Sequence, residues 1–309
     1  MKLQQNNNLF VYTILIFSML FWGTSFVFTI IALEILDPIS IVFIRLLISA
    51  VMLWIIVAIF FRKEKISFSL FKWIAVLAFF EPFIYFIGET YGLQRVSPVV
   101  TSLIIATIPV FTAIVMQLFF RVKLTTINFI GIFISLSGVV LILVGKNMQF
   151  DVDILGLLLL FLAVFAAVGY GILLNKLVSN VHPIWLIAAQ NTFGALFFLP
   201  LYLVLRKTPN FDYATVFTFL SPQGEMWTCI LLLSIFSSSL AFIFYSIAVR
   251  KIGIARGIVF ANLIPIFTAI TSFFLLGEHL SITKIAGIFI VIFGLMLTQR
   301  KKMESDTHS

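Results

Sequence analysis

Three ionisable side chains interrupt stretches of sequence that are otherwise strongly apolar. Arg45, Glu81 and Glu89 each lie in a run long enough and apolar enough to cross a bilayer. A charge at the centre of a bilayer costs about 2.5–3.5 kcal/mol on insertion scales, so one that stays there usually has a partner or a function. Their predicted depths allow two interpretations. One is a structural Arg45–Glu89 pair that joins two helices, and the other is a substrate or proton site in the outer half of a cavity.

Glu81 is the sharper candidate, because it lies near the middle of its predicted span and directly precedes Pro82. Proline cannot donate a backbone hydrogen bond, so we expect a kink at Pro82 and an unpaired carbonyl one turn earlier. Apolar surroundings favour the neutral carboxyl, which makes Glu81 a candidate proton carrier. The alternative is a permanently protonated Glu81 bonded to a neighbouring helix.

Uncharged polar residues occur in the later part of the chain. Gln190, Asn191, Tyr245 and Asn262 could offer hydrogen bonds to a substrate, although amides in membrane helices also join helices to one another. Together with Arg45, such groups would suit a substrate that carries a carboxylate.

Prolines and glycines predict where the helices bend and where they pack closely. Pro109 and Pro265 lie near the middles of two further apolar segments, and with Pro82 they are our candidates for gating kinks. Two glycine pairs, each seven residues apart on one helical face, predict close helix packing: Gly131 with Gly138, and Gly287 with Gly294.

The segments that carry these residues occur twice. The hexapeptide Pro109–Ile114 recurs, with one substitution, as Pro265–Ile270, 156 residues further on. Gly131–Ile134 recurs as Gly287–Ile290 at the same offset. Internal repeats of this kind are typical of secondary transporters, whose substrate site lies between the repeats. In this register the positions that correspond to the two glutamates are uncharged, so the ionisable groups belong to the first half.

The composition predicts an all-α integral membrane protein. The 309 residues are 62% hydrophobic and 10% charged, whereas a soluble domain is about a quarter charged. A span needs about 20 mostly apolar residues. Ten segments qualify: about 9–31, 39–61, 71–92, 99–120, 127–145, 154–174, 184–205, 226–248, 257–276 and 283–299.

Lys and Arg in the predicted loops suggest the orientation. Fourteen fall in one alternating set of segments and five in the other, while Arg45 lies within a span. Positive residues concentrate on the cytoplasmic side, so we expect both termini in the cytoplasm. Five spans per half then make the two halves inverted repeats, at 9–145 and 154–299, followed by a disordered cytoplasmic tail at 300–309.

This pattern resembles the EamA-type branch of the drug/metabolite transporter superfamily. The resemblance rests on Trp22–Ser25, on Phe43–Leu46 around Arg45, on the paired proline and glycine helices, and on Leu276–Leu280. The equivalent turn in the first half departs from the family's Gly-Glu pattern, because Arg121 and Val122 stand there. The resemblance implies a ten-helix transporter of small metabolites. These are often amino acids or related compounds, and the direction of transport is often outward.

We therefore expect a secondary transporter of the cytoplasmic membrane that works by alternating access, with proton coupling as a further hypothesis. A channel or a membrane-embedded enzyme is the alternative, but no loop carries a catalytic cluster. The lone Cys229 and three scattered histidines predict no metal site or other cofactor. The expected partners are a small-molecule substrate and the lipid bilayer, with a homodimer as an option and no nucleic acid.

Overall fold

The computed structural model describes residues 2–61, 68–120, 125–143, 153–206, 221–253, 257–278 and 281–298. The described residues form helices and turns and contain no strand. The tail predicted at 300–309 lies outside them.

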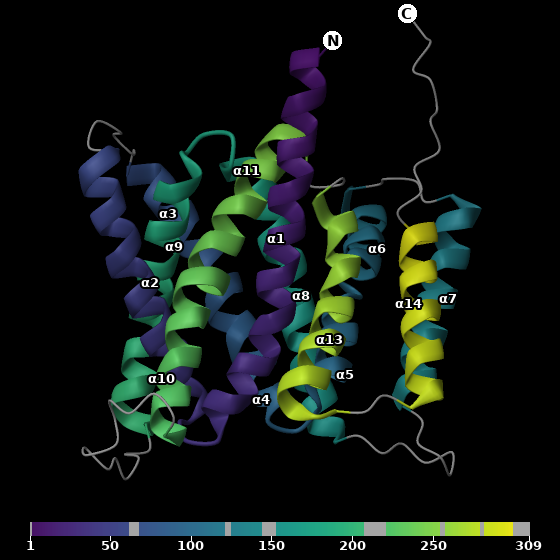
Figure 1. The fold of residues 1–309 in the computed structure, drawn as a ribbon. Coiled ribbons are helices and arrows are strands. Elements are labelled where there is room, and N and C mark those ends of the chain that lie inside the picture. The colour runs from purple at the N-terminus through teal and green to yellow at the C-terminus, as the bar shows by residue number, and fades with distance from the viewer. Residues whose placement is uncertain are drawn as a thin grey trace, which may run out of the picture.

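The helices fall into two series along the chain, which Figure 1 shows as one bundle. The first series is α1 (Lys2–Leu33), α2 (Pro38–Phe60), α3 (Phe68–Ala78), the π-helix η1 (Phe79–Ile84), α4 (Tyr85–Leu93), α5 (Pro98–Ile105), α6 (Ile108–Phe120) and α7 (Thr126–Leu143). The second series is α8 (Ile154–Leu177), α9 (Pro183–Leu205), α10 (Pro222–Leu232), the π-helix η2 (Leu233–Ala241), α11 (Phe242–Ile252), the 3₁₀ helix η3 (Ile258–Leu263), α13 (Ile264–Leu276) and α14 (Ile282–Thr298).

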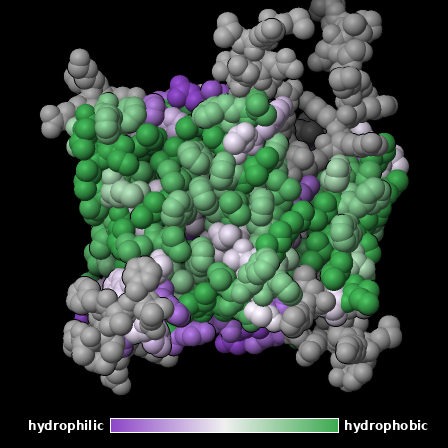
Figure 2. Space-filling model, viewed as in Figure 1, coloured by the Kyte–Doolittle hydropathy of each residue, from purple (hydrophilic) through white to green (hydrophobic). Residues whose placement is uncertain are grey.

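Seven helical segments in the described part of the chain are long and apolar enough to cross a membrane. They are Leu9–Leu33, Pro38–Phe60, Ser69–Leu93, Pro98–Phe119, Ile154–Leu177, Pro183–Leu205 and Pro222–Ile252. Three shorter apolar helices occupy the other expected positions: Thr126–Leu141, Phe260–Leu276 and Ile285–Thr298. Figure 2 shows apolar side chains across the middle of the visible face, with hydrophilic ones gathered at its two ends. Ten spans therefore remain a prediction.

The bounds of several helices recur between the two series. In the repeat register that aligns Pro109 with Pro265, α6 and α13 begin and end at corresponding positions, and α7 and α14 begin at corresponding positions. A second register, which aligns Pro38 with Pro183, matches both ends of α2 with those of α9. Two of these related pairs also pack against one another, α2 on α9 and α7 on α14. Helix α1 begins at the end of the bundle where α14 ends (Figure 1).

Side-chain caps fix where four of the helices begin. Asp37, Ser97, Asp153 and Ser221 each accept a backbone N–H three residues ahead, which satisfies one of the free donors of a first turn. Asp153 also accepts a hydrogen bond from Arg95 Nη1 at 2.8 Å. The backbone N–H of Gly156 and then the guanidinium of Arg95 lower the pKa of Asp153 below its usual range. This exposed pair ties the loop after α4 to the start of α8.

Glycine allows α7 and α14 to approach at backbone contact. A Cβ placed on Gly131 would meet the backbone of Thr298 and would lie 2.7 Å from the carbonyl oxygen of Gly294. A Cβ on Gly138 would lie 2.8 Å from the backbone nitrogen of Val291. Asn128 adds a hydrogen bond from Nδ2 to the Thr298 carbonyl at 2.7 Å. The contact between these helices therefore uses three of the four glycines predicted to pack closely.

Helix breaks lie at all three prolines that we predicted to kink. Glu81, the residue before Pro82, has extended backbone angles (φ −144°, ψ 118°) inside η1. Helix α5 ends at Ile105 and α6 begins at Ile108, directly before Pro109. The 3₁₀ helix η3 gives way to α13 at Ile264, directly before Pro265.

Candidate functional site

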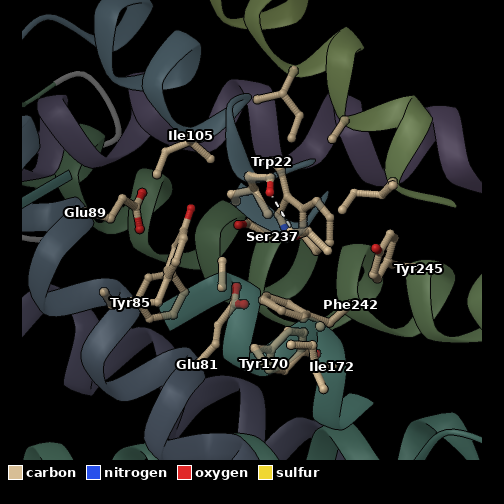
Figure 3. Close-up of a pocket in the computed structure, with 18 of the residues that line it drawn as sticks. Trp22, Glu81, Tyr85, Glu89, Ile105, Tyr170, Ile172, Ser237, Phe242 and Tyr245 are labelled. Carbon is tan, nitrogen blue, oxygen red and sulfur yellow. Dashed lines mark hydrogen bonds between the residues drawn. The ribbon is translucent and has the colours of Figure 1, made fainter. Parts of the chain in front are cut away.

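A cavity of about 340 Å³ lies inside the bundle, within the range of small-molecule sites. Both series of helices contribute to its wall. Its lining includes Trp22, Ser25 and Phe26 from α1, Glu81 from η1, Tyr85, Phe86 and Glu89 from α4, residues of α5, α6 and α8, Ser237 from η2, Phe242 and Tyr245 from α11, and residues of η3 and α13. The wall is mostly apolar, with few polar groups (Figure 3).

The cavity reaches the surface near the C-terminal end of α8. Asn175 and Lys176 line it and are exposed, whereas Glu89 lines it and is only 2% exposed. The last turn of α8 lies at the end of the bundle where α1 begins (Figure 1). The cavity is therefore open towards that end, while the Arg95–Asp153 pair lies at the opposite end.

The breaks in the helices face this cavity. Glu81, Ile108 and Ile264 all line it, and each directly precedes one of the three prolines. The Glu81 segment is seated against glycines of the second series. Pro82 packs on Gly194 of α9. A Cβ on Gly169 of α8 would lie only 2.7 Å from the ring of Phe80. Two glycines thus let the broken helix approach α8 and α9 closely enough to present Glu81 to the cavity.

Two carboxylates enter the cavity from one face of the chain. Glu81, Tyr85 and Glu89 are spaced four residues apart and all line the cavity, and Figure 3 shows their side chains directed into it. Glu81 is 8% exposed. Oε2 of Glu89 has no hydrogen-bond partner among the described residues. A buried acceptor without a partner is costly, so Glu89 has capacity for a ligand, a proton or water.

A cluster of aromatic rings lies on another part of the wall. Trp22 stands 5.1 Å from Phe242 and 5.2 Å from Tyr245, measured between ring centroids. Phe242 is 6.2 Å from Tyr170 in an edge-on arrangement. Glu81 interacts electrostatically with both Tyr170 and Tyr245. We call Trp22, Tyr170, Phe242 and Tyr245 the aromatic cluster.

Arg45 does not form the ion pair with Glu89 that the sequence suggested as one alternative. No nitrogen of Arg45 lies within 4.0 Å of a carboxylate oxygen, and among the described residues the ion pair is Arg95–Asp153. Instead, Nε donates to Ser238 Oγ at 2.9 Å and Nη2 to Ser237 Oγ at 3.1 Å. The ring of Phe86 covers the guanidinium at 4.3 Å. Depth along a helix placed the two groups at similar levels, but the hydroxyls of η2 lie closer.

Arg45 belongs to a buried polar network that joins α2, α9 and η2. Asn191 Nδ2 donates to Ser49 Oγ at 2.6 Å and to the Ser238 carbonyl at 2.8 Å. Ser49 Oγ and Ser239 Oγ share a further hydrogen bond of 2.6 Å. All of these residues are at most 3% exposed, and apart from Ser237 none lines the cavity. The network fixes the π-helix of the second series.

The remaining predicted site residues divide between the cavity and its surroundings. Tyr245 lines the cavity, whereas Gln190 and Asn262 do not. Gln190 Oε1 accepts a hydrogen bond from the Tyr170 hydroxyl at 3.3 Å. Both polar atoms of the Asn262 side chain lack partners among the described residues.

Sequence reasoning missed most of the aromatic wall. The sequence did offer a reason to single out two of these residues. Trp22 opens the motif that carried the family resemblance, and Tyr85 lies midway between the two glutamates. It offered none for Tyr170 and Phe242, because aromatic residues are common throughout this chain, which contains 37 Phe.

A bundle of apolar helices around a cavity that opens at one end has the architecture of a membrane transporter. The comparisons agree and give the family. The sequence profile of the EamA-like transporter family matches residues 9–144 and 154–300, so the chain belongs to this family and is a multi-pass membrane protein. The family points to transport rather than to enzymatic activity.

The relatives are named only as transporters. An "Uncharacterized transporter" of Archaeoglobus fulgidus is 25% identical over 289 residues, which is 94% of this chain and 98% of the relative. "Uncharacterized transporter YetK" of Bacillus subtilis is 26% identical over 236 residues, 75% of this chain and 69% of the relative. A solved structure titled "Crystal structure of protein" has a TM-score of 0.69, with 13% identity, over 93% of this chain and 97% of that one. At that identity the likeness shows the fold alone.

Proposed function

We propose that this protein is a secondary transporter that moves a small metabolite across the cytoplasmic membrane by alternating access, in the outward direction. It would do so with ten spans arranged as two inverted repeats, 9–145 and 154–299. The observation that carries the proposal is the cavity, which both series of helices line and which reaches the surface at the exposed C-terminal end of α8. The recurrence of helix bounds, from α2 to α9 and from α6 to α13, supports the repeats.

The three helix breaks support alternating access. Each presents its residue before proline to the cavity, so a bend at Pro82, Pro109 or Pro265 would change the shape of the wall directly. Discontinuous helices at the substrate site are a recurring feature of secondary transporters. The cavity would close at its present mouth and open at the end where Arg95 and Asp153 pair.

We propose Glu81 as the group that couples transport to protons. It is buried, lies at the break of η1 and lines the cavity. The ionisable groups around it are Glu89 and Tyr85 on α4, Arg45 on α2, Tyr170 and Lys176 on α8, and Tyr245 on α11. A carboxyl that alternates between proton and substrate would link the two fluxes.

The test uses the purified full chain in proteoliposomes, with a labelled mixture of amino acids and other small metabolites inside. A pH gradient should drive the efflux of at least one compound, and empty liposomes should show none. Glu81→Gln keeps the shape of the side chain and removes its titratable proton. We expect it to retain substrate exchange but to lose the efflux that the pH gradient drives.

Accessibility gives an independent measurement of the same residue. Cys229 is the single cysteine and is 6% exposed, so Cys229→Ser provides a cysteine-free background. Glu81→Cys in that background should react with a water-soluble thiol reagent in at least one transport state. Unchanged pH-driven transport in Glu81→Gln would exclude the proton role, and a thiol that stays unreactive in every state would exclude the access pathway.

A further inference from the structure

The charges that face the cavity are acidic. Glu81 and Glu89 both line it and are buried, and Oε2 of Glu89 has no partner among the described residues. Lys176 is the one cationic side chain found on the described wall, and it is exposed at the mouth. At 1.5 Å per helical residue it lies about 9 Å along α8 from Tyr170. The interior of the cavity therefore attracts positive charge.

Arg45 is screened from the cavity in this arrangement. It does not line the cavity, its Nε and Nη2 donate to Ser238 and Ser237, and Phe86 covers its face, although Nη1 has no partner among the described residues. A carboxylate substrate, as the sequence suggested, would have to displace the ring of Phe86 to reach the guanidinium from the cavity. The guanidinium instead offsets part of the charge of the two glutamates, with which it interacts electrostatically.

The charge of the cluster leaves room for one cation. Two ionised carboxylates and one guanidinium carry a net charge of minus one, and a buried uncompensated charge is costly. One bound proton would make the cluster neutral, and so would one monovalent organic cation. The two would therefore compete for the same carboxylates.

The aromatic cluster provides the second half of such a site. A cation within about 6 Å of a ring centroid is attracted by the negative face of the ring. Trp22, Tyr170, Phe242 and Tyr245 are connected through centroid distances of 5.1–6.2 Å, and Glu81 interacts with two of them. Figure 3 shows these rings and the carboxylate around one space. Their apolar faces also suit an aromatic or aliphatic body.

We infer that the substrate is a monovalent organic cation with an aromatic or apolar body, held by the aromatic cluster and by Glu81 or Glu89. On binding, the cation displaces one proton from this pair of carboxyls, and that proton returns when the cation leaves on the other side. The inference rests on the proposed transport function and specifies its substrate class and its exchange ratio of one cation for one proton.

The test compares three probes of similar shape and different charge. Phenyltrimethylammonium is a permanent cation, 4-tert-butylphenol is neutral at pH 7, and 4-tert-butylbenzoate is an anion. Full-length protein in proteoliposomes should accumulate labelled phenyltrimethylammonium against its gradient when a pH gradient is imposed. Unlabelled cation should compete at least 10-fold better than the phenol or the benzoate. A pH-sensitive dye should report one proton moved for each cation.

Variants test the role of the aromatic cluster in binding separately from its role in the fold. Trp22→Leu removes a ring and keeps an apolar side chain, and it should weaken binding of phenyltrimethylammonium about 3- to 30-fold, the range of one cation–π contact. Phe17→Leu is the matched control on the same helix, because Phe17 is 44% exposed and does not line the cavity.

The outcomes separate this inference from the proposed function. If the benzoate or the phenol competes as well as the cation, or if Trp22→Leu and Phe17→Leu behave alike, the cation site is overturned. If neutral or anionic metabolites are transported and cations are not, the transporter stands and the inference fails. If neither the metabolite mixture nor the three probes are transported, the proposed function itself fails.

Discussion

Arg45 is the largest side chain among the described residues that are less than 2% exposed. Its two hydrogen bonds run to hydroxyls 192 and 193 residues further along the chain. A buried guanidinium is retained only with such partners, because removing them would leave the charge uncompensated. The contact therefore joins α2 to the broken helix of the second series, and its effect on function would act through the position of η2.

Arg45→Ala should impair transport more than Gln190→Ala does. Loss of the guanidinium leaves Ser237 and Ser238 without their donor, and an unsatisfied buried group costs about 1–3 kcal/mol. We expect a lower midpoint of thermal unfolding, followed in detergent by intrinsic fluorescence, together with reduced transport in proteoliposomes. Gln190 makes one contact of 3.3 Å with Tyr170, so its replacement should have the smaller effect on both. Normal abundance with normal transport in Arg45→Ala would contradict a structural role and a site role alike.

Single residues also show where sequence reasoning succeeded and where it stopped. The two glutamates were found because a carboxylate in an apolar run is unusual, and both line the cavity. The partner of Arg45 was missed because hydrogen bonding depends on the rotation of each helix, which depth along the axis does not give. Tyr170 and Phe242 were missed because one ring in a Phe-rich chain has no distinguishing pattern.

Helix breaks are the elements that give the cavity its shape. The π-helices η1 and η2 occupy related stretches, since η1 falls within η2 in the register that aligns Pro109 with Pro265. Proline explains the break in η1, but η2 contains no proline and is fixed by the network of Ser238, Ser239, Ser49 and Asn191. Sequence therefore predicted the first break and could not predict the second, which arises from tertiary contacts.

Gly131→Ala should weaken the packing of α7 on α14. The new Cβ would meet backbone atoms of Thr298 and Gly294, which cannot rotate away, and overpacking of this kind costs about 1–3 kcal/mol. The thermal midpoint should fall accordingly. Gly257→Ala is the control, because its Cβ would meet only side-chain atoms, Val249 Cγ2 at 3.3 Å and Tyr245 Cε2 at 3.6 Å. Equal midpoints for the two variants would show that α7 and α14 separate without loss of stability.

At the scale of the whole molecule, hydropathy predicted an all-helical membrane bundle, and the order of elements follows from it. Length alone does not fix the number of spans, because α7, α13 and α14 are shorter than the seven long apolar segments. The arrangement of helices around the cavity could not be predicted, since helices of similar composition offer no sequence signal for their neighbours. The repeat register helps only in naming which helices are related.

Reporter fusions at Lys65 and Lys146 test the ten-span topology. Both positions lie outside the described residues, but α2 ends at the end of the bundle where α1 begins, and α7 ends at the other (Figure 1). Positive residues favour the cytoplasm, so the Lys65 fusion should be active as a cytoplasmic reporter and the Lys146 fusion as an external one. Activity on the same side for both would overturn the topology and the inverted repeats with it.

The contact between Arg45 and η2 has a consequence for the ancestry of the chain. In the register of the repeated hexapeptide, Ser237 and Ser238 correspond to Glu81 and Pro82, and proline has no side-chain acceptor. A protein assembled from two copies of the first half would bury Arg45 without the hydroxyls that hold it. One assembled from two copies of the second half would lack both cavity glutamates. In this register the two halves carry complementary groups, so we expect that neither can substitute for the other and that a lesion in one is not rescued by supplying a second copy of its counterpart.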